Sequence, residues 1–172
     1  MTLTPDVSVL GSAVAGASVA YGLTAKGARV VLVERDRRDA RSDTCNSAGQ
    51  ARVHDSDPAR ARPAALAFDT FAPWPDAFGG NCGFRRTGHA FLASTEGAAQ
   101  LANDVGWLAE LGADVATMSP PEFTDIHPCL ELTDAAAVAY EPGGGYADPV
   151  RATLALRAAA QAGVPCPLRS FR

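Results

Sequence analysis

Residues 6–34 read DVSVLGSAVAGASVAYGLTAKGARVVLVE, and this stretch decides the fold. The apolar run at 7–10 is typical of a short strand buried on both faces, as parallel strands in α/β proteins are. A glycine turn follows, and the sequence then predicts a helix from Val14 to about Ala25, ended by Lys26-Gly27. A second apolar run at 28–33 completes a strand–helix–strand unit. The stretch therefore indicates an α/β fold built on parallel strands.

The turn between the first strand and the helix is Gly11-Ser12-Ala13-Val14-Ala15-Gly16, which matches G-x-G-x-x-G with alanine at the second glycine. Gly11 permits the tight turn, Ala13 stands where the backbone must approach a pyrophosphate, and Gly16 lets the helix pack close to the strand. The helix directs free N–H groups and the positive end of its dipole at that phosphate. The motif predicts a dinucleotide phosphate site at residues 11–16; a close-packed βα corner without a ligand is the alternative.

Glu34 ends the second predicted strand, about 20 residues after the glycines, where a carboxylate accepts hydrogen bonds from ribose hydroxyls. The same negative charge would repel a 2′-phosphate, so Glu34 disfavours NADP. FAD and NAD remain as candidate cofactors.

The composition excludes several classes of function. The chain has 172 residues, 47% of them apolar, which suffices for one domain or for a small second one as well. A net charge of −4 gives no electrostatic basis for binding nucleic acid or an anionic membrane surface. The N-terminus lacks the basic residues of a secretory signal. The four cysteines form no C-x-x-C pair, so we expect a cytoplasmic protein with reduced thiols and no metal site.

After residue 34 the regular βαβ pattern gives way to shorter elements. A long loop is expected at 35–50. After Val164, Pro165-Cys166-Pro167 cannot donate regular ladder hydrogen bonds, so no further strand of the parallel sheet is expected. Asp57 and Pro58 are the candidate N-cap and first residue of a helix at 59–72, which Pro73 and Pro75 would end; because of Pro63, this helix begins near Arg62 or is kinked. The other predicted elements are a hairpin or bulged strand pair at 84–93, a helix at 96–111 capped by Thr95, a strand at 115–118, a helical turn opened by Ser119, a strand at 136–140, a turn at 143–146, and a helix from Pro149 to Gly163 capped by Asp148.

Four segments together resemble the N-terminal half of the FAD-dependent oxidoreductases of the D-amino-acid oxidase superfamily, particularly the sarcosine and glycine oxidase-like branch. They are DVSVLGSAVAGASVAYGLTAKGARVVLVERD at 6–36, SAGQAR at 47–52, NCGFRRTGHAFLA at 81–93 and EPGGGYADPVRATLALRAAAQAGV at 141–164. The resemblance implies a Rossmann-like FAD/NAD(P)-binding βαβ unit with part of an α+β substrate domain, truncated before its second half. The expected division is an FAD-binding portion at 1–80, a partial substrate-domain insertion at 81–145, and a return helix with an irregular tail at 146–172.

The resemblance also implies which residues contact FAD. The glycine turn would hold the pyrophosphate, Glu34 and Arg35 the adenosine ribose, and a small-residue segment would run beside the flavin. Some relatives attach FAD through a histidine just before that segment; Asn46 stands there, so non-covalent FAD is expected. The full set of expected cofactor contacts is Gly11, Ser12, Ala13, Val14, Ala15, Gly16, Glu34, Arg35, Ser47, Ala48, Gly49, Gln50 and Arg52.

By the same resemblance, the substrate is a small amine or amino acid whose C–N bond is oxidised. His54, His89 and His127 form no catalytic constellation, so the catalytic residues are expected outside this chain. Two alternatives stay open. In the first, the chain is a truncated, non-catalytic nucleotide-binding fragment, which acts alone, with a complementary chain or as a homo-oligomer. In the second, the chain is the NAD-binding domain of a dehydrogenase.

Overall fold

The computed structural model describes residues 4–35, 42–163 and 168–170, which divide into two compact units. Unit 1 contains residues 1–49, 70–84 and 147–172, and unit 2 contains residues 50–69 and 85–146. Part of the predicted 35–50 loop and the predicted break at Pro165-Cys166-Pro167 lie outside the described residues. No helix among the described residues combines the length and the apolar character that crossing a membrane requires.

Unit 1 is a parallel sheet with helices packed against it. Strand β1 (Val7–Leu10) pairs in parallel with β2 (Val30–Glu34), and β2 pairs in parallel with β9 (Leu168–Ser170). Helix α1 (Val14–Thr24) connects β1 to β2, as the sequence predicts, and thereby forms the βαβ unit. The last strand contradicts the expectation that the sheet would not continue after Val164: the prolines precede β9 and leave residues 168–170 free to pair.

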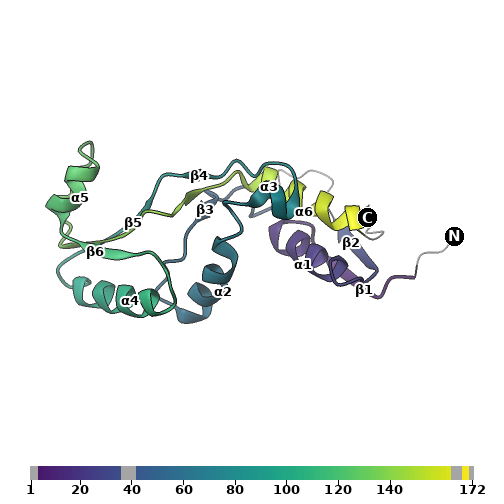
Figure 1. Cartoon of the computed structure of the whole chain (residues 1–172), viewed down its shortest axis with the longest axis horizontal. Coiled ribbons are helices and arrows are strands. Elements are labelled where there is room, and N and C mark those ends of the chain that lie inside the picture. The colour runs from purple at the N-terminus through teal and green to yellow at the C-terminus, as the bar shows by residue number, and fades with distance from the viewer. Residues whose placement is uncertain (1–3, 36–41, 164–167, 171–172) are drawn as a thin grey trace. The chain divides into compact units, whose positions relative to one another are not determined.

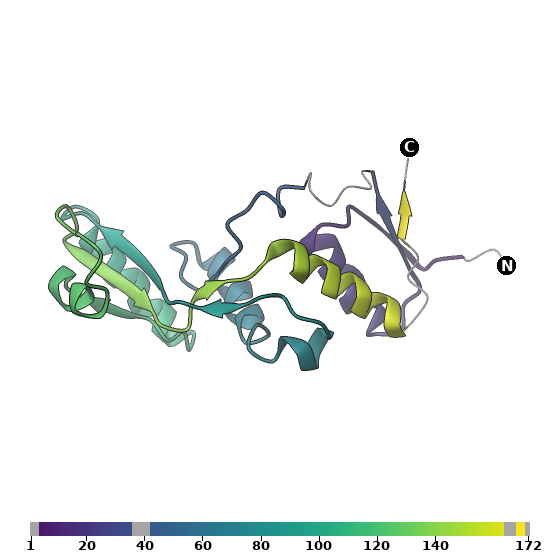
Figure 2. The same cartoon turned by 90° about the horizontal axis from the view of Figure 1, so that it is seen from above.

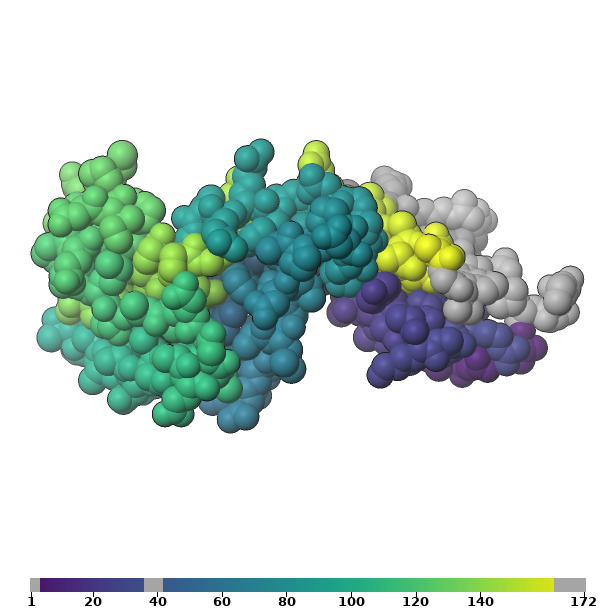
Figure 3. All heavy atoms as spheres, viewed as in Figure 1, coloured from purple at the N-terminus to yellow at the C-terminus, as the bar shows by residue number. Residues whose placement is uncertain are grey.

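Helices α1 and α6 (Pro149–Gly163) lie side by side in unit 1 (Figures 1 and 2), and their atoms adjoin in the space-filling view (Figure 3). The contact is made by small side chains, Ala20 and Ala160, which are both fully buried with Val30 of β2. Small residues let two helix backbones approach closely, so α6 packs tightly against the βαβ unit. A second cluster around Trp74 and Cys82 joins α1 and α6 to the short helix α3 (Trp74–Phe78).

Unit 2 contains two small antiparallel sheets and three helices. In the first sheet β8 (Gly145–Tyr146) lies between β3 (Gln50–Ala51) and β4 (Arg85–Arg86). In the second sheet β7 (Ala137–Glu141) lies between β5 (His89–Ala93) and β6 (Ala116–Met118). Helix α4 (Ala98–Glu110) packs on β6 and β7 through Leu101 and Leu108. The remaining helices are α2 (Pro58–Phe68) and α5 (Pro120–Ile126).

The hairpin predicted at 84–93 is wrong. Its two strands do not pair with each other: β4 pairs with β8, and β5 pairs with β7, both far along the chain. Gly88 separates the two strands, and a β-carbon on it would lie 2.5 Å from the Tyr140 hydroxyl, so this backbone passes close to a side chain of β7. The local alternation gave the strands but carried no information on their distant partners.

The helix predicted at 59–72 begins at Pro58 with Asp57 as its N-cap, which confirms that signal and not the alternative start near Arg62, and it ends at Phe68. Pro63 lies inside the helix and has no N–H to donate to the carbonyl of Ala59. Ala59 is exposed, so water can donate a hydrogen bond to this carbonyl instead. Pro73 and Pro75, expected to end that helix, instead open α3, because proline is tolerated in a first turn. Helix α4 takes Gly97 as its N-cap instead of Thr95.

Local capping signals are confirmed. Ser119 and Glu122 form the reciprocal capping box of α5, with Ser119 N–H and Oγ–H each 2.7 Å from the Glu122 carboxylate. The Asp148 carboxylate accepts hydrogen bonds from the N–H groups of Val150 and Arg151 at the start of α6.

Candidate functional site

The glycine turn has the geometry that the motif demands at its first and last positions. Gly11 has a φ of +90°, which disfavours any residue with a side chain, and its N–H donates to the carbonyl of Val33 at 2.8 Å. A β-carbon on Gly16 would lie 1.8 Å from the carbonyl oxygen of Gly11. The turn and the helix therefore touch backbone to backbone at Gly16, and only glycine permits that contact.

Ala13 occupies the middle glycine position with an ordinary backbone. Its φ is −66° and its ψ −177°, an extended conformation open to any residue, so alanine causes no strain here. Ala13 is the N-cap of α1, its side chain makes no capping hydrogen bond, and its carbonyl accepts the first helical bond from Ala17 N–H at 2.9 Å. The first-turn N–H groups, which have no intrahelical partner, thus point out of the helix end, where an anion binds.

Glu34 turns back toward the glycine turn. Its Oε2 accepts hydrogen bonds from the Ser12 N–H at 2.7 Å and from the Ser12 hydroxyl at 2.9 Å, and its Oε1 accepts one from the Arg35 N–H at 2.8 Å. The end of β2 is thereby tied to the turn after β1. The carboxylate is held in place next to the glycine turn, where the sequence places a ribose.

A groove of about 570 Å³ opens at the carboxyl ends of the two strands. It is lined by Leu10, Gly11, Val33, Glu34 and Arg35. In open α/β sheets, ligands bind in the crevice outside the carboxyl ends of the strands. Of the predicted cofactor contacts, Gly11, Glu34 and Arg35 line this one groove.

Arg157, on α6, contacts the same turn and was not predicted from the sequence. Its Nε donates to the carbonyl of Ser12 at 2.8 Å, and its Nη2 donates to the Ser12 hydroxyl. Ser12 is fully buried beneath these contacts. An arginine on an amphipathic helix 145 residues away carries no local signal that would link it to the glycine motif.

The segment expected beside the flavin is divided between the two units. Ser47, Ala48 and Gly49 belong to unit 1, whereas Gln50 and Arg52 belong to unit 2. Gly49 has a φ of +62°, and a β-carbon on it would lie 2.1 Å from the carbonyl oxygen of Ala147, just before α6. Its own carbonyl accepts the Ala147 N–H at 2.8 Å. Glycine at position 49 thus allows a close backbone contact with the residue just before α6.

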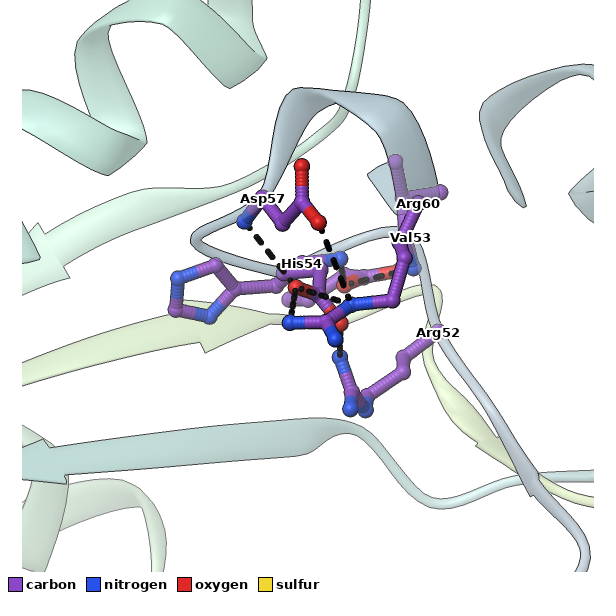
Figure 4. Close-up of polar contacts among 7 residues, drawn as sticks. Arg52, Val53, His54, Asp57 and Arg60 are labelled. Carbon is purple, nitrogen blue, oxygen red and sulfur yellow. Dashed lines mark hydrogen bonds and ion pairs between the residues drawn. The ribbon is translucent and has the colours of Figure 1, made fainter. Parts of the chain in front are cut away.

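Arg52 takes part in a polar cluster of unit 2 (Figure 4). Its guanidinium lies 4.9 Å from the centre of the Phe91 ring and 3.8 Å from the Asp55 carboxylate. Asp55 also accepts a hydrogen bond from Arg60 Nε at 3.0 Å. Close by, the buried carboxylate of Glu141 accepts hydrogen bonds from the backbone N–H groups of Val53, at 2.9 and 3.1 Å, and His54, at 3.0 Å.

His54 points its imidazole away from these ion pairs (Figure 4) and packs edge-on against Phe91, with ring centroids 4.0 Å apart. It is 2% exposed, and neither ring nitrogen has a hydrogen-bond partner. Burial lowers the pKa of His54, with the charges of Asp104 and Arg52 as smaller, opposing influences. The imidazole is therefore neutral at pH 7 and belongs to the core of unit 2.

Comparisons with known proteins identify the family of this chain. A family model described as "FAD dependent oxidoreductase" matches residues 6–166. Over 156 residues the chain is 30% identical to FAD-dependent oxidoreductase domain-containing protein 1 of Xenopus laevis, an alignment that covers 84% of this chain and 31% of that protein. The chain thus spans about a third of the length of the curated relative that it matches.

Solved structures show the same fold. L-proline dehydrogenase from P. horikoshii matches with a TM-score of 0.82 at 20% identity, over 100% of this chain and 45% of that one. Glycine oxidase from Geobacillus kaustophilus matches with a TM-score of 0.76 at 24% identity, over 98% of this chain and 47% of that one. These matches confirm the predicted α/β, Rossmann-like fold. With the glycine turn, its carboxylate partner and a family model that spans nearly all of its length, the chain belongs to the FAD dependent oxidoreductase family.

Proposed function

We propose that unit 1 binds the ADP portion of FAD at residues 11–16, with Glu34 and Arg35 at the adenosine ribose. The observation that carries the proposal is the contact of Gly16 with the Gly11 carbonyl, because it sets the α1 N-terminus directly beside the groove that Glu34 lines. Helix N–H groups would bind the pyrophosphate, and the Glu34 carboxylate would accept from ribose hydroxyls and reject a 2′-phosphate.

The flavin side of the cofactor would run along α6 toward residues 47–49. Gly49 lies beside the first turn of this helix, since a β-carbon on it would lie 3.3 Å from Pro149 Cδ, and Ser12 contacts the helix about two turns further on, at Arg157. That separation corresponds to about 12 Å at 1.5 Å per residue. One helix thus borders both segments proposed to contact FAD, which suits an extended dinucleotide. Asn46 has an amide that cannot form the covalent bond of a histidine, so the proposal includes non-covalent attachment.

The reaction we propose is oxidation of a C–N bond in a small amine or amino acid. Bound flavin supplies the redox chemistry, and the protein binds and orients it. His54 is 2% exposed and packs against Phe91 in unit 2, so we assign it no role in proton transfer. The role that we propose for this chain in the reaction is cofactor binding.

A second candidate is a nucleotide-binding module that acts together with another polypeptide. One observation favours it: Leu10, at the end of β1, is 80% exposed, and Val7 is 36% exposed, although both lie in a strand type that is usually buried. Capture of β1 by a strand from another chain would cover both side chains.

Calorimetric titration of the purified chain with FAD, ADP and NADP tests the proposal. We expect FAD and ADP to bind and NADP to bind more weakly, because a 2′-phosphate would lie beside the Glu34 carboxylate. Tightest binding by NADP would contradict the cofactor assignment. Acid precipitation checks the attachment: flavin should stay in the supernatant, and a yellow pellet would show a covalent bond.

A further inference from the structure

Arg157 reaches the glycine turn with two donors at once. Its Nε–H donates to the Ser12 carbonyl oxygen at 2.8 Å, and its Nη2 donates to the Ser12 hydroxyl. The accepting residue is fully buried, so both contacts are shielded from solvent on the Ser12 side. A planar guanidinium that bonds one residue at two points fixes orientation as well as position.

Ser12 also forms hydrogen bonds with Glu34. Its hydroxyl accepts from Arg157, so the hydroxyl proton is free to be donated to Glu34 Oε2, at 2.9 Å. Its backbone N–H donates to the same oxygen at 2.7 Å. A hydroxyl has one donor and two acceptor positions, and this arrangement uses the donor on Glu34. Arg157 of α6, Ser12 of the turn and Glu34 of β2 thus form one connected network.

The bond to the Ser12 carbonyl has a consequence for the next amide. The described peptide bonds include no cis bond, and in a trans peptide the C=O and N–H point in opposite directions. Because Arg157 holds the Ser12 carbonyl on its own side, the Ala13 N–H must face away from Arg157. Rotation of this peptide would instead turn a carbonyl oxygen outward, and a carbonyl repels phosphate oxygens.

We propose that Arg157 is a positioning residue for the pyrophosphate of an adenine dinucleotide. It holds the Ser12–Ala13 peptide in the orientation that presents the Ala13 N–H to the phosphate, and through Ser12 it fixes the Glu34 carboxylate. The inference rests on the proposed function, since it concerns the same nucleotide site. It assigns Arg157 no direct contact with the ligand.

Three variants of the full chain distinguish a positioning role of Arg157 from an effect of its positive charge alone. Arg157→Met removes both donors, Arg157→Lys keeps the positive charge but loses the two-point contact, and Arg151→Met is the matched control on the same helix. Arg151 has a side chain 63% exposed and lies 3.4 Å from Asp148. Calorimetry with ADP and with adenosine measures the result.

We expect Arg157→Met and Arg157→Lys each to weaken ADP binding roughly 10-fold, the scale of losing a hydrogen bond to a charged group. Adenosine, which has no phosphate, should lose less affinity, and Arg151→Met should bind ADP like the parent. Full ADP affinity in Arg157→Lys would overturn the proposal, since charge alone would then suffice. Full affinity in Arg157→Met would overturn it as well.

Hydrogen exchange of the nucleotide-free chain gives a readout that does not depend on ligand binding. Arg157→Met should speed exchange at amides 11–17 while the amides of unit 2 keep their rates. Unchanged exchange at 11–17 would overturn the positioning role. If Arg157→Met does not fold, Arg157→Lys, which keeps the charge and most of the stem, carries the same comparison. A parent chain that binds neither FAD nor ADP would refute the proposed function, while the exchange data would still decide the role of Arg157.

Discussion

Gly16 is the residue at which the turn and the helix come closest, so it gives the sharpest test of the glycine turn. A β-carbon there would lie 1.8 Å from the Gly11 carbonyl oxygen, and neither backbone can give way without moving α1 off β1. We expect Gly16→Ala to abolish ADP binding and to destabilise unit 1 by about 2 kcal/mol or more. Calorimetry with ADP and thermal unfolding measure the two effects.

Gly22 provides the matched control, because it lies in the same helix and an added β-carbon would meet nothing within 4 Å. Alanine has the higher helix propensity, so Gly22→Ala should leave ADP binding intact and stabilise the chain by about 0.5–1 kcal/mol. Equal loss of binding in both variants would mean that the loss does not depend on the close contact at Gly16, and the clash argument for Gly16 would then be wrong.

His54 makes the stability of unit 2 depend on pH. Burial lowers its folded-state pKa below the ordinary value of 6.5, so between the two values the unfolded chain binds more protons than the folded chain. The contribution of neutral His54 to the free energy of unfolding is complete above pH 6.5, and it is lost as the pH falls toward the folded-state pKa. We expect the free energy of unfolding to fall on going from pH 7.5 to pH 5, by at most about 1.4 kcal/mol per pH unit for this group.

The comparison variant is His54→Phe, which keeps an aromatic ring against Phe91 and removes two buried nitrogens that have no partner. It should flatten the pH dependence and leave stability at pH 7.5 equal or higher. Part of the slope should remain, because burial and the charge of Arg52 also lower the pKa of His89. Denaturant titrations at several pH values decide the point, and an unchanged slope in His54→Phe would show that other groups cause it.

At the residue scale, the sequence could identify those residues of the candidate site whose role follows from a local pattern. Gly11 and Gly16 were identifiable because the turn demands glycine, and Glu34 because the next strand must end beside that turn. Arg157 was not identifiable, because its role depends on how α6 packs against α1. Nor could the sequence show that Arg52 lies over Phe91, which is a contact within unit 2.

At the scale of elements, the sequence predicted features that depend on neighbouring residues, and it did not predict those that depend on residues far along the chain. Capping chemistry placed α5 and α6 correctly, since the Ser119–Glu122 box and the Asp148 cap act within one turn. Strand pairing was not predictable: the alternation at 84–93 indicated strands, but β4 pairs with Gly145–Tyr146 and β5 with Ala137–Glu141, both far along the chain. The strand β9 shows the same limit, because proline blocks pairing only at its own position.

Glu141 joins two elements of unit 2, and its removal should be costly. The carboxylate is 3% exposed and accepts the N–H groups of Val53 and His54, which precede α2. Glu141→Ala would leave two buried donors without acceptors, so we expect a loss of about 2–4 kcal/mol, with Glu141→Gln losing less because its amide oxygen still accepts. The exposed Glu131 of the same unit is the control, and Glu131→Ala should stay within about 0.5 kcal/mol of the parent.

The two tryptophans make this measurement specific to one unit. Trp74 lies in unit 1 and Trp107 in unit 2, and the sequence contains no other tryptophan. In a Trp74→Phe background, the fluorescence of Trp107 follows the unfolding of unit 2 alone. Trp74 has a buried ring nitrogen without a hydrogen-bond partner, so phenylalanine is a mild replacement. In the converse Trp107→Phe background, Trp74 follows unit 1, and a loss of stability seen there instead would place the effect of Glu141 outside its own unit.

At the scale of the whole molecule, the strand order leaves β1 at an edge. Among the described residues the parallel sheet runs β1-β2-β9, so one side of β1 has no neighbouring strand. The strand that leads into the glycine turn is therefore an edge strand, and it carries an apolar side chain, Leu10, which is 80% exposed. Exposed apolar edge strands pair with other chains.

We therefore expect the purified chain to self-associate through β1, and Leu10→Lys to shift it toward monomer. A charged side chain on an edge strand opposes edge-to-edge pairing, and at 80% exposure the change should cost little stability. Leu66 is the matched control: it is 84% exposed but lies on α2, so Leu66→Lys adds the same charge without touching an edge. Sedimentation velocity over a range of concentrations measures the association. Equal effects of the two variants would point to general charge repulsion, and a parent chain that is monomeric at every concentration would show that β1 is covered in some other way.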